Sequence, residues 1–243
     1  MSDPRLARLL EHPALWRGRS AARSGVVPTG FAALDASLPG NGWPQVGLVE
    51  ILTPRLGVGE LYLLLPALAL LTRQPAARWC AWVAPPFEPF APALAAHGVR
   101  LSRVLVVRAA RAPGSESNER AEPAARPGRP LWACEQALRS GACEAVLAWL
   151  QSVQSRALRR LQLATERGRT LGFLFRTLSS VTLREPTHAV LRIAVEPQAA
   201  GVRVRLLKSR GGSREVVDLE LGAAGVSSPP AGTDPGPHAV ADA

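Results

Sequence analysis

The sequence predicts an α/β fold in which a mainly parallel sheet is flanked by helices, and three observations carry that prediction. Short β-rich runs alternate with helical runs between residues 47 and 176, which is the pattern of parallel βαβ units. The chain has 243 residues, 47% of them hydrophobic and only 5% aromatic, so it can bury one sizeable aliphatic core. Two β-rich runs after residue 189 are separated by a short turn and predict a C-terminal β-hairpin.

The expected strands are runs of β-branched and apolar residues bounded by turn-forming residues. They cover residues 47–52, 79–83, 104–107, 144–150, 170–176, 190–195 and 202–207. The last of them alternates apolar residues with arginines, as a strand with one exposed face does. The expected helices carry apolar residues at three- and four-residue spacing. They cover residues 57–74, 88–97, 131–140 and 153–167.

Changes in composition divide the chain into segments. Residues 1–24 hold a short helical segment and a hinge, and residues 25–221 form the α/β domain. The stretch 109–130 is expected to be a flexible insertion, because it has almost no large apolar residue to offset the entropy of ordering. Residues 222–243 are expected to be a disordered tail. The apolar face of the N-terminal helix either binds a partner or packs on its own core, and its residues are Leu6, Leu9, Leu10, Leu15 and Trp16.

The chain is strongly basic, with 29 Lys and Arg against 19 Asp and Glu and a formal net charge of +10. Such a balance favours nucleic acid or an acidic protein as partner, with a genomic bias towards arginine as the alternative explanation. Lys208 is the single lysine. The three cysteines have no zinc-ligand spacing and predict buried free thiols in a reducing compartment. No signal sequence or membrane-length apolar run is found, so a cytoplasmic protein without membrane contact is expected.

One stretch is more specific than the rest. Residues 28–38 read PTGFAALDASL, residues 40–44 read GNGWP, and residues 47–51 read GLVEI. This succession of a helical turn, a glycine-rich turn and a strand resembles the entry of RecA-family proteins into their first core strand. The resemblance is strong over residues 26–60 and continues to about residue 176 in the order of elements. It implies a RecA-like core of the P-loop type.

The phosphate-binding loop that such a core needs is degenerate. A working loop has the form GxxxxGK[ST]: backbone N–H groups hold the phosphates, the lysine reaches them, and the hydroxyl holds Mg²⁺. Here the lysine and hydroxyl positions are Gly59–Glu60 or Glu60–Leu61, and apolar residues stand where the strand 144–150 should end in a metal-binding aspartate. We therefore expect no hydrolysis, no catalytic residue, no metal and no cofactor. The degenerate loop comprises Thr53, Pro54, Arg55, Gly57, Gly59 and Glu60.

The chain is similar to the ImuA family of bacterial translesion-synthesis accessory proteins, which is itself related to the SulA cell-division inhibitors. The resembling stretches are residues 12–17, 28–38, 48–52, 59–61, 82–86, 131–141, 145–149, 157–164 and 207–212. The resemblance implies a non-catalytic scaffold of DNA repair, acting in SOS-induced mutagenesis. Its implied partners are a Y-family polymerase-like protein, indirectly an error-prone replicative polymerase subunit, and also RecA and single-stranded DNA. In this interpretation the N-terminal segment docks on RecA or on the polymerase-like protein.

Two basic clusters are candidates for nucleic-acid contact, because neutralising phosphates gives salt-sensitive, sequence-independent binding. The first lies on the helix 153–167, where a solvated face is the alternative interpretation. The second lies on the strand 202–207 and its glycine-rich exit, where neighbouring cations repel one another unless an anionic partner screens them. The candidates are Arg156, Arg159, Arg160, Arg203, Arg205, Lys208, Arg210 and Arg214.

Two rival functions stay open. The relationship to SulA makes a cell-division inhibitor that caps the FtsZ polymer a genuine alternative, and such a protein blocks FtsZ assembly whereas an accessory protein does not. The second rival is an active ATPase whose divergent loop uses Arg55 as its cation. ATP turnover that is abolished by Arg55→Ala would identify it.

Overall fold

The computed structural model describes residues 25–108, 129–209 and 215–221. Its strands are β1 (Val26–Val27), β2 (Trp43–Pro44), β3 (Gly47–Thr53), β4 (Trp79–Val83), β5 (Val104–Val107), β6 (Cys143–Trp149), β7 (Leu171–Thr177), β8 (Leu191–Gln198), β9 (Gly201–Ser209) and β10 (Val216–Glu220). Its α-helices are α2 (Ala32–Ser37), α3 (Leu65–Arg73), α4 (Ala91–Ala96), α5 (Arg129–Arg139), α6 (Ser155–Gly168) and α7 (Ser180–Arg184). Two 3₁₀ turns lie at Tyr62–Leu64 and Leu101–Arg103.

An eight-stranded sheet organises these elements in the order β10-β9-β8-β3-β7-β6-β4-β5. The pairings from β8 through to β5 are parallel, and β8–β9 and β9–β10 are antiparallel. Every residue of β3 is buried, because helices cover both faces of the sheet and neighbouring strands cover both edges of β3. The expected mixed α/β fold, with a mostly parallel sheet flanked by helices, is confirmed.

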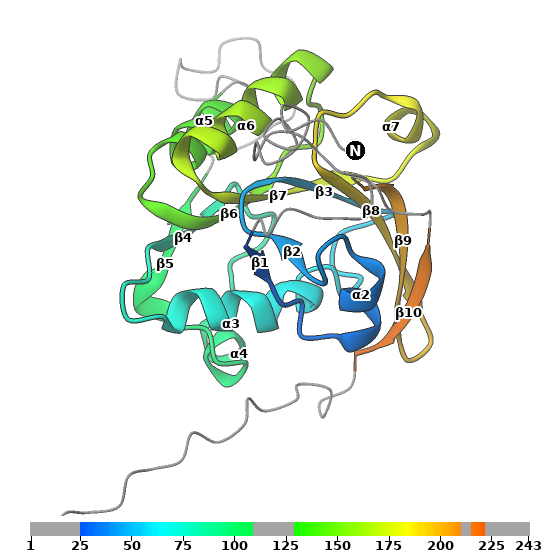
Figure 1. The fold of residues 1–243 in the computed structure, drawn as a ribbon, viewed down its shortest axis with the longest axis horizontal. Helices are drawn as coiled ribbons and strands as arrows, with labels where there is room; N and C mark the ends of the chain where they lie inside the picture. Colours follow the sequence, from blue (N-terminus) through cyan, green and yellow to red (C-terminus); the bar gives the residue numbers. More distant parts are fainter. Residues whose placement is uncertain (1–24, 109–128, 210–214, 222–243) are drawn as a thin grey trace, which may run out of the picture.

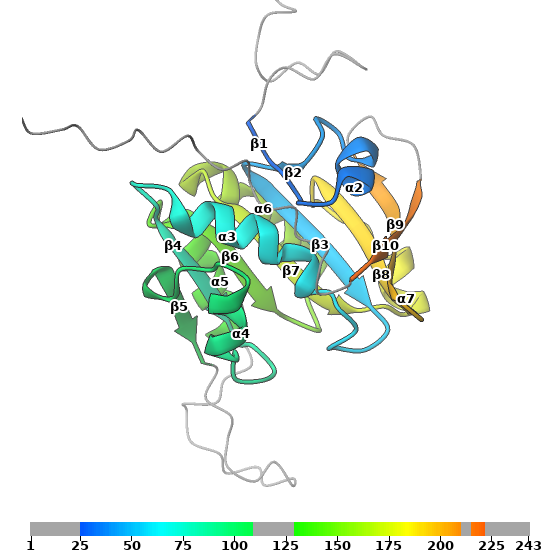
Figure 2. The same cartoon turned by 90° about the horizontal axis from the view of Figure 1, so that it is seen from below.

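The helices form two layers, one on each face of the sheet (Figure 1). α5, α6 and α7 lie on one face, and Figure 2 looks onto the other face, which is covered by α2, α3 and α4. Side chains of β3 pack on both faces of the sheet. Ile51 belongs to the core under α3, and Leu48 belongs to the core under α5 and α6. The sheet is therefore buried on both sides over its parallel part.

α6 is held against both α5 and the start of β3. A Cβ atom at Gly168 would lie 1.9 Å from the carbonyl oxygen of Leu138 in α5, so only glycine allows this approach of the two helices. The side-chain carbonyl of Gln162 accepts a hydrogen bond of 2.9 Å from the backbone N–H of Leu48. These contacts fix α6 over the middle of the sheet.

The expected strands at 79–83 and 104–107 are confirmed residue for residue, and the largest differences concern helix starts. The helix expected over 57–74 was wrong at its beginning: α3 starts at Leu65, because Gly57 and Gly59 adopt φ values of 80° and 103° that no α-helix contains. The helix expected over 88–97 is shortened to Ala91–Ala96. Arg129 and Pro130 were assigned to the insertion but belong to α5.

The expected C-terminal hairpin is present as β8 and β9, which pair around Gln198 and Gly201. Two elements beyond it were not predicted. β10 adds a third antiparallel strand, in which Val217 and Leu219 are buried. α7 is a single turn whose sequence signal is a capping box between Ser179 and Thr182.

All described elements lie within the expected domain of residues 25–221. The RecA-like character expected for its core is not confirmed; what is established is the mixed α/β sheet. Our expectations for residues 1–24, 109–128 and 222–243 concern segments outside the described residues. Within the described part of the chain, none of the helices has the length and apolarity needed to cross a membrane.

Candidate functional site

The loop in which a degenerate phosphate site was expected lies between β3 and α3, and the side chain of Glu60 folds back onto its backbone. Oε1 of Glu60 accepts a hydrogen bond of 2.8 Å from the backbone N–H of Gly57, and Oε2 accepts one of 2.8 Å from that of Val58. Glu60 is buried, with 5% of its surface exposed. Successive backbone N–H groups in such a turn are the donors that a working loop offers to phosphate. In this chain those donors are already bonded to a carboxylate.

Packing closes the same loop from the side of the antiparallel strands. A Cβ atom at Gly59 would lie 2.7 Å from Cδ1 of Leu221 and 2.9 Å from Cγ1 of Val202. Thr53 is completely buried, whereas Pro54 and Arg55 are exposed. Within the described part of the chain, no hydrogen bond or ion pair holds Arg55 over the loop. Among the described residues, the structure therefore shows no interaction that holds Arg55 in the position of the missing lysine, as the ATPase interpretation requires.

Aromatic side chains fill the carboxyl ends of the neighbouring parallel strands, where α/β proteins commonly bind ligands. Trp149 at the end of β6 stacks on Phe175 of β7 with ring centroids 4.7 Å apart. Trp82 of β4 lies on its other side, at a centroid distance of 5.7 Å. Trp149 thus ends the strand in which a metal-binding aspartate was sought. No group of His, Cys, Asp and Glu among the described residues could hold a metal ion.

A buried ion network lies at the centre of the sheet, and the sequence analysis missed it. Glu50 of β3 is fully buried and accepts hydrogen bonds from Nη1 of Arg176 at 2.9 Å and from Nε of Arg192 at 2.8 Å. Since β7 and β8 flank β3, the two arginines reach the carboxylate from opposite sides. Glu185, next to α7, accepts from Nη2 of Arg176 at 2.8 Å and, through its backbone oxygen, from Nη1 of Arg192 at 2.9 Å. The network therefore ties α7 to three strands.

The arginines keep Glu50 ionised despite its burial. Burial by itself would raise the pKa of Glu50, but hydrogen bonds from Arg192, Thr187 and Arg176, together with the charge of Arg192, hold that pKa below its ordinary value. The available signal in the sequence was one charged residue inside each of three otherwise apolar runs, GLVEILT, LGFLFRT and LRIAV. A charge on a strand that is buried on both faces requires a partner on a neighbouring strand.

The first basic cluster lies on the exposed side of α6. Arg156, Arg159 and Arg160 are all exposed. Arg160 forms an ion pair with Glu135 of α5. Arg156 and Arg159 have no ion-pair partner within the described residues, and Arg156 lies in the first helical turn, where the helix dipole disfavours a cation. These two arginines are the members of the cluster whose charge is available to an anion.

The second basic cluster is only partly described and is largely compensated by neighbouring carboxylates. Nε and Nη2 of Arg203 donate to Asp218 of β10 at 2.7 and 2.8 Å, and Nη2 of Arg205 donates to Glu196 of β8 at 2.6 Å. Lys208 donates to the backbone oxygen of Thr187 at 2.8 Å. These pairings relieve the mutual repulsion that favoured a polyanion here, so nucleic-acid binding by this cluster stays a prediction.

The remaining predicted site residues lie outside the described residues. They are Leu6, Leu9, Leu10, Leu15 and Trp16 of the N-terminal segment, and Arg210 and Arg214 of the β9–β10 connection.

The cysteines are free and buried, as expected. Burial raises the pKa of Cys80 to about 12 and that of Cys134 to about 12. Both thiols are therefore protonated near neutral pH and poor nucleophiles.

An aromatic loop between β4 and α4 stands out on the surface. Phe87 and Phe90 are 71% and 70% exposed, although phenylalanine is usually buried. Between them, Glu88 forms an ion pair with Arg108 at the end of β5. Prolines at positions 85, 86, 89 and 92 restrict the backbone on either side of the rings. The loop therefore presents two apolar rings from a stiffened backbone.

Comparison with known proteins identifies a family. The chain is 32% identical over 160 residues to the cell division inhibitor SulA of Edwardsiella piscicida, a match that covers 64% of this chain and 78% of that protein. The crystal structure of SulA from Pseudomonas aeruginosa is 24% identical and covers 54% of this chain and 98% of its own, with a TM-score of 0.40 that adds no argument about the fold. No protein-family model matches the chain. Neither comparison confirms the narrower resemblance to ImuA proteins, and the chain belongs to the SulA family.

Proposed function

We propose that this protein is a non-catalytic, SOS-linked inhibitor of cell division that acts by binding FtsZ and stopping its assembly. The observation that carries the proposal is the 32% identity to the cell division inhibitor SulA over 160 residues, spanning 78% of that protein. The alternative named from the sequence thus has more support than the translesion-synthesis scaffold. The scaffold interpretation, with its polymerase-like partner, RecA and single-stranded DNA, stays a prediction that the same experiment addresses.

The closed phosphate loop supports inhibition by binding rather than by catalysis. Glu60 takes up the backbone donors of Gly57 and Val58, and the chain has no lysine near the loop, since its single lysine is Lys208. An inhibitor that binds no nucleotide has no ATP with which to remodel a polymer. An inhibitor of this kind has to act stoichiometrically, by occupying a surface of its target.

The loop that carries Phe87 and Phe90 is the described surface best suited to that contact. Exposed aromatic rings contribute strongly to interfaces, and rings on a stiff backbone lose little entropy on binding. The double variant Phe87→Ala/Phe90→Ala should therefore lose most of its affinity for FtsZ, by about 2 kcal/mol or more. Its folding should be unchanged, because both rings are about 70% exposed in the free protein.

Sedimentation of FtsZ polymers with GTP tests the proposal. The wild-type protein should keep FtsZ in the supernatant, and the double variant should not. Leu101→Ala is the matched control, because Leu101 is also exposed (40%) but lies on a different surface turn. Unimpaired FtsZ assembly in excess wild-type protein, together with capture of the polymerase-like protein, would return the scaffold interpretation to first place.

A further inference from the structure

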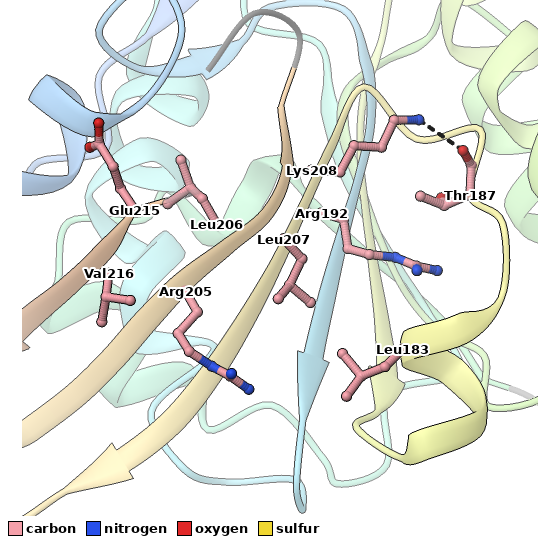
Figure 3. A pocket seen from close by; sticks show the side chains of 9 residues that line it. All are labelled: Leu183, Thr187, Arg192, Arg205, Leu206, Leu207, Lys208, Glu215 and Val216. Carbon is pink, nitrogen blue, oxygen red and sulfur yellow. Dashed lines mark hydrogen bonds between the residues drawn. The ribbon is translucent and has the colours of Figure 1, made fainter. Parts of the chain in front are cut away.

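A cavity of about 480 Å³ opens between α7, the segment that follows it, and the face of β8, β9 and β10 on the α7 side of the sheet (Figure 3). None of the residues that line it belongs to the loop after β3 or to the aromatic loop. Its wall combines the basic side chains of Arg192, Arg205 and Lys208 with the apolar side chains of Leu183, Leu207 and Val216. Glu215 also lines it, but its carboxylate points away from both guanidinium groups in Figure 3.

Two of the arginines that line this cavity each have one buried guanidinium nitrogen without a hydrogen-bond partner among the described residues. The side chain of Arg192 is 5% exposed, and its Nε and Nη1 are bonded to Glu50 and Glu185. Nη2 of Arg192 is buried and has no hydrogen-bond partner among the described residues. Arg205 uses Nη2 for Glu196, while its buried Nε has no partner among them. Buried donors of this kind are rare, since an unmade hydrogen bond to a charged group is costly.

The network on the far side of Arg192 makes its free donor rigid. Glu50 lies 2.8 Å from Nε and the backbone oxygen of Glu185 lies 2.9 Å from Nη1, so the guanidinium plane cannot turn without breaking both bonds. Lys208 fixes the neighbouring wall by its bond to Thr187. A donor that is held in place before binding loses little entropy when it receives an acceptor.

We propose that this cavity is a binding site for a single carboxylate attached to an apolar body. The carboxylate accepts from Nη2 of Arg192, because a guanidinium favours the planar geometry of that group. The apolar body rests on Leu183 and Leu207, which lie between the two guanidinium groups in the view of Figure 3. The volume is within the range of small-ligand sites. The same chemistry is found in a free carboxylic acid and in an acidic or C-terminal residue of a partner chain.

The surroundings favour this ligand over a nucleic-acid backbone. A polyanion needs a row of exposed cations, yet Arg203 is paired with Asp218 and Arg205 with Glu196 at the outer part of this face. The side chain of Arg192, by contrast, is only 5% exposed. A ligand with one anionic group and an apolar body can contact both the basic and the apolar side chains that line the cavity.

Titration of the full chain with N-acetyl-leucine, and with N-acetyl-leucinamide as the matched probe without a carboxylate, tests the site. We expect saturable binding of N-acetyl-leucine. The titration is monitored by NMR through the side-chain N–H signals of Arg192 and Arg205. The amide should bind with an affinity lower by about tenfold or more, because it lacks the charge-assisted hydrogen bond. A peptide that ends in leucine and binds more tightly than N-acetyl-leucine would identify a partner chain as the source, and equal binding would identify a free acid.

Three variants separate the site from a general effect of charge. Leu183→Glu places a carboxylate in the cavity, and Arg205→Gln removes its second guanidinium, so each should weaken binding about tenfold. Arg203→Gln, on the same strand but outside the cavity, should bind as wild type does. Equal binding of acid and amide, no saturation up to about 10 mM, or equal losses in all three variants would overturn the proposal. A single-stranded oligonucleotide could also bind more strongly than N-acetyl-leucine and lose its binding in Leu183→Glu and Arg205→Gln. That result would overturn the proposal and identify phosphate as the ligand. FtsZ sedimentation is scored separately, so failure here leaves the proposed function intact.

Discussion

The loop after β3 and the cavity beside β8 differ in whether their buried hydrogen-bond donors have acceptors. At the loop, Glu60 accepts from the backbone N–H groups of Gly57 and Val58, so the donors that would hold a phosphate are satisfied within the chain. At the cavity, Nη2 of Arg192 and Nε of Arg205 are buried without a partner among the described residues. In the first region the chain itself supplies the acceptor, and in the second we propose that a ligand supplies it.

The order of elements in an α/β fold does not by itself locate a ligand. The position where the RecA-like interpretation places phosphate is filled by a side chain, while the available donors lie on an antiparallel extension of the sheet. The proposed ligand site rests on buried donors without acceptors and not on the order of the elements.

The largest effect is expected where the cavity is anchored. Glu50→Ala leaves Arg176 and Arg192 buried without their shared carboxylate. We expect the free energy of unfolding to fall by about 3–5 kcal/mol, the usual cost of removing one partner from a buried ion pair. Urea denaturation measures it, with Glu88→Ala as control, because the ion pair of Glu88 with Arg108 is exposed. If both variants lose the same small amount, the network does not organise the sheet.

Acid should weaken the same network without a mutation. The pKa of Glu50 is lower in the folded protein than its ordinary value of about 4.3. Its contribution to stability is therefore complete above that ordinary value and is lost as the pH falls through the folded pKa. Urea midpoints between pH 7 and pH 3 should decline in the acid range, and Glu50→Gln should flatten the decline. An unchanged pH profile in Glu50→Gln would assign acid unfolding to other carboxylates.

A smaller loss is expected at the phosphate loop. Glu60→Ala leaves two backbone N–H groups without their acceptor, which should cost about 1–3 kcal/mol. Glu60→Gln keeps one acceptor oxygen and should lose less. Neither variant should acquire ATP binding, because the loop still lacks its lysine. A fluorescent ATP analogue measures this, and tight binding to Glu60→Ala would show that the carboxylate alone had excluded nucleotide.

The smallest effect concerns the surface of α6. If this surface binds single-stranded DNA, Arg156→Gln and Arg159→Gln should each lower the salt dependence of binding by about one ion. Arg160→Gln should change it less, because Arg160 is already paired with Glu135. Fluorescence anisotropy at several salt concentrations compares them. Equal effects of all three substitutions would mean that ion pairing on this face does not select the contact residues.

The alternation of apolar runs predicted the parallel sheet well, because strands buried on both faces have little freedom in composition. The strand expected at residues 47–52 is present as β3, whereas the RecA-like character and the phosphate-loop role of the residues after it stay predictions. The sequence could not reveal that Glu60 would bond to Gly57 and Val58, because that bond depends on positive φ angles at two glycines. Nor could it pair Glu50 with Arg176 and Arg192, which lie 126 and 142 residues away.

An FtsZ assembly titration, read by light scattering with and without ATP, tests most directly whether this SulA-family protein acts by binding alone. If the protein acts by binding alone, inhibition should reach its endpoint near one inhibitor per FtsZ subunit, should not grow with incubation time and should be the same in both nucleotide conditions. ATP-dependent inhibition at far less than one inhibitor per FtsZ subunit would contradict this mechanism. So would the absence of inhibition at a large excess of the protein.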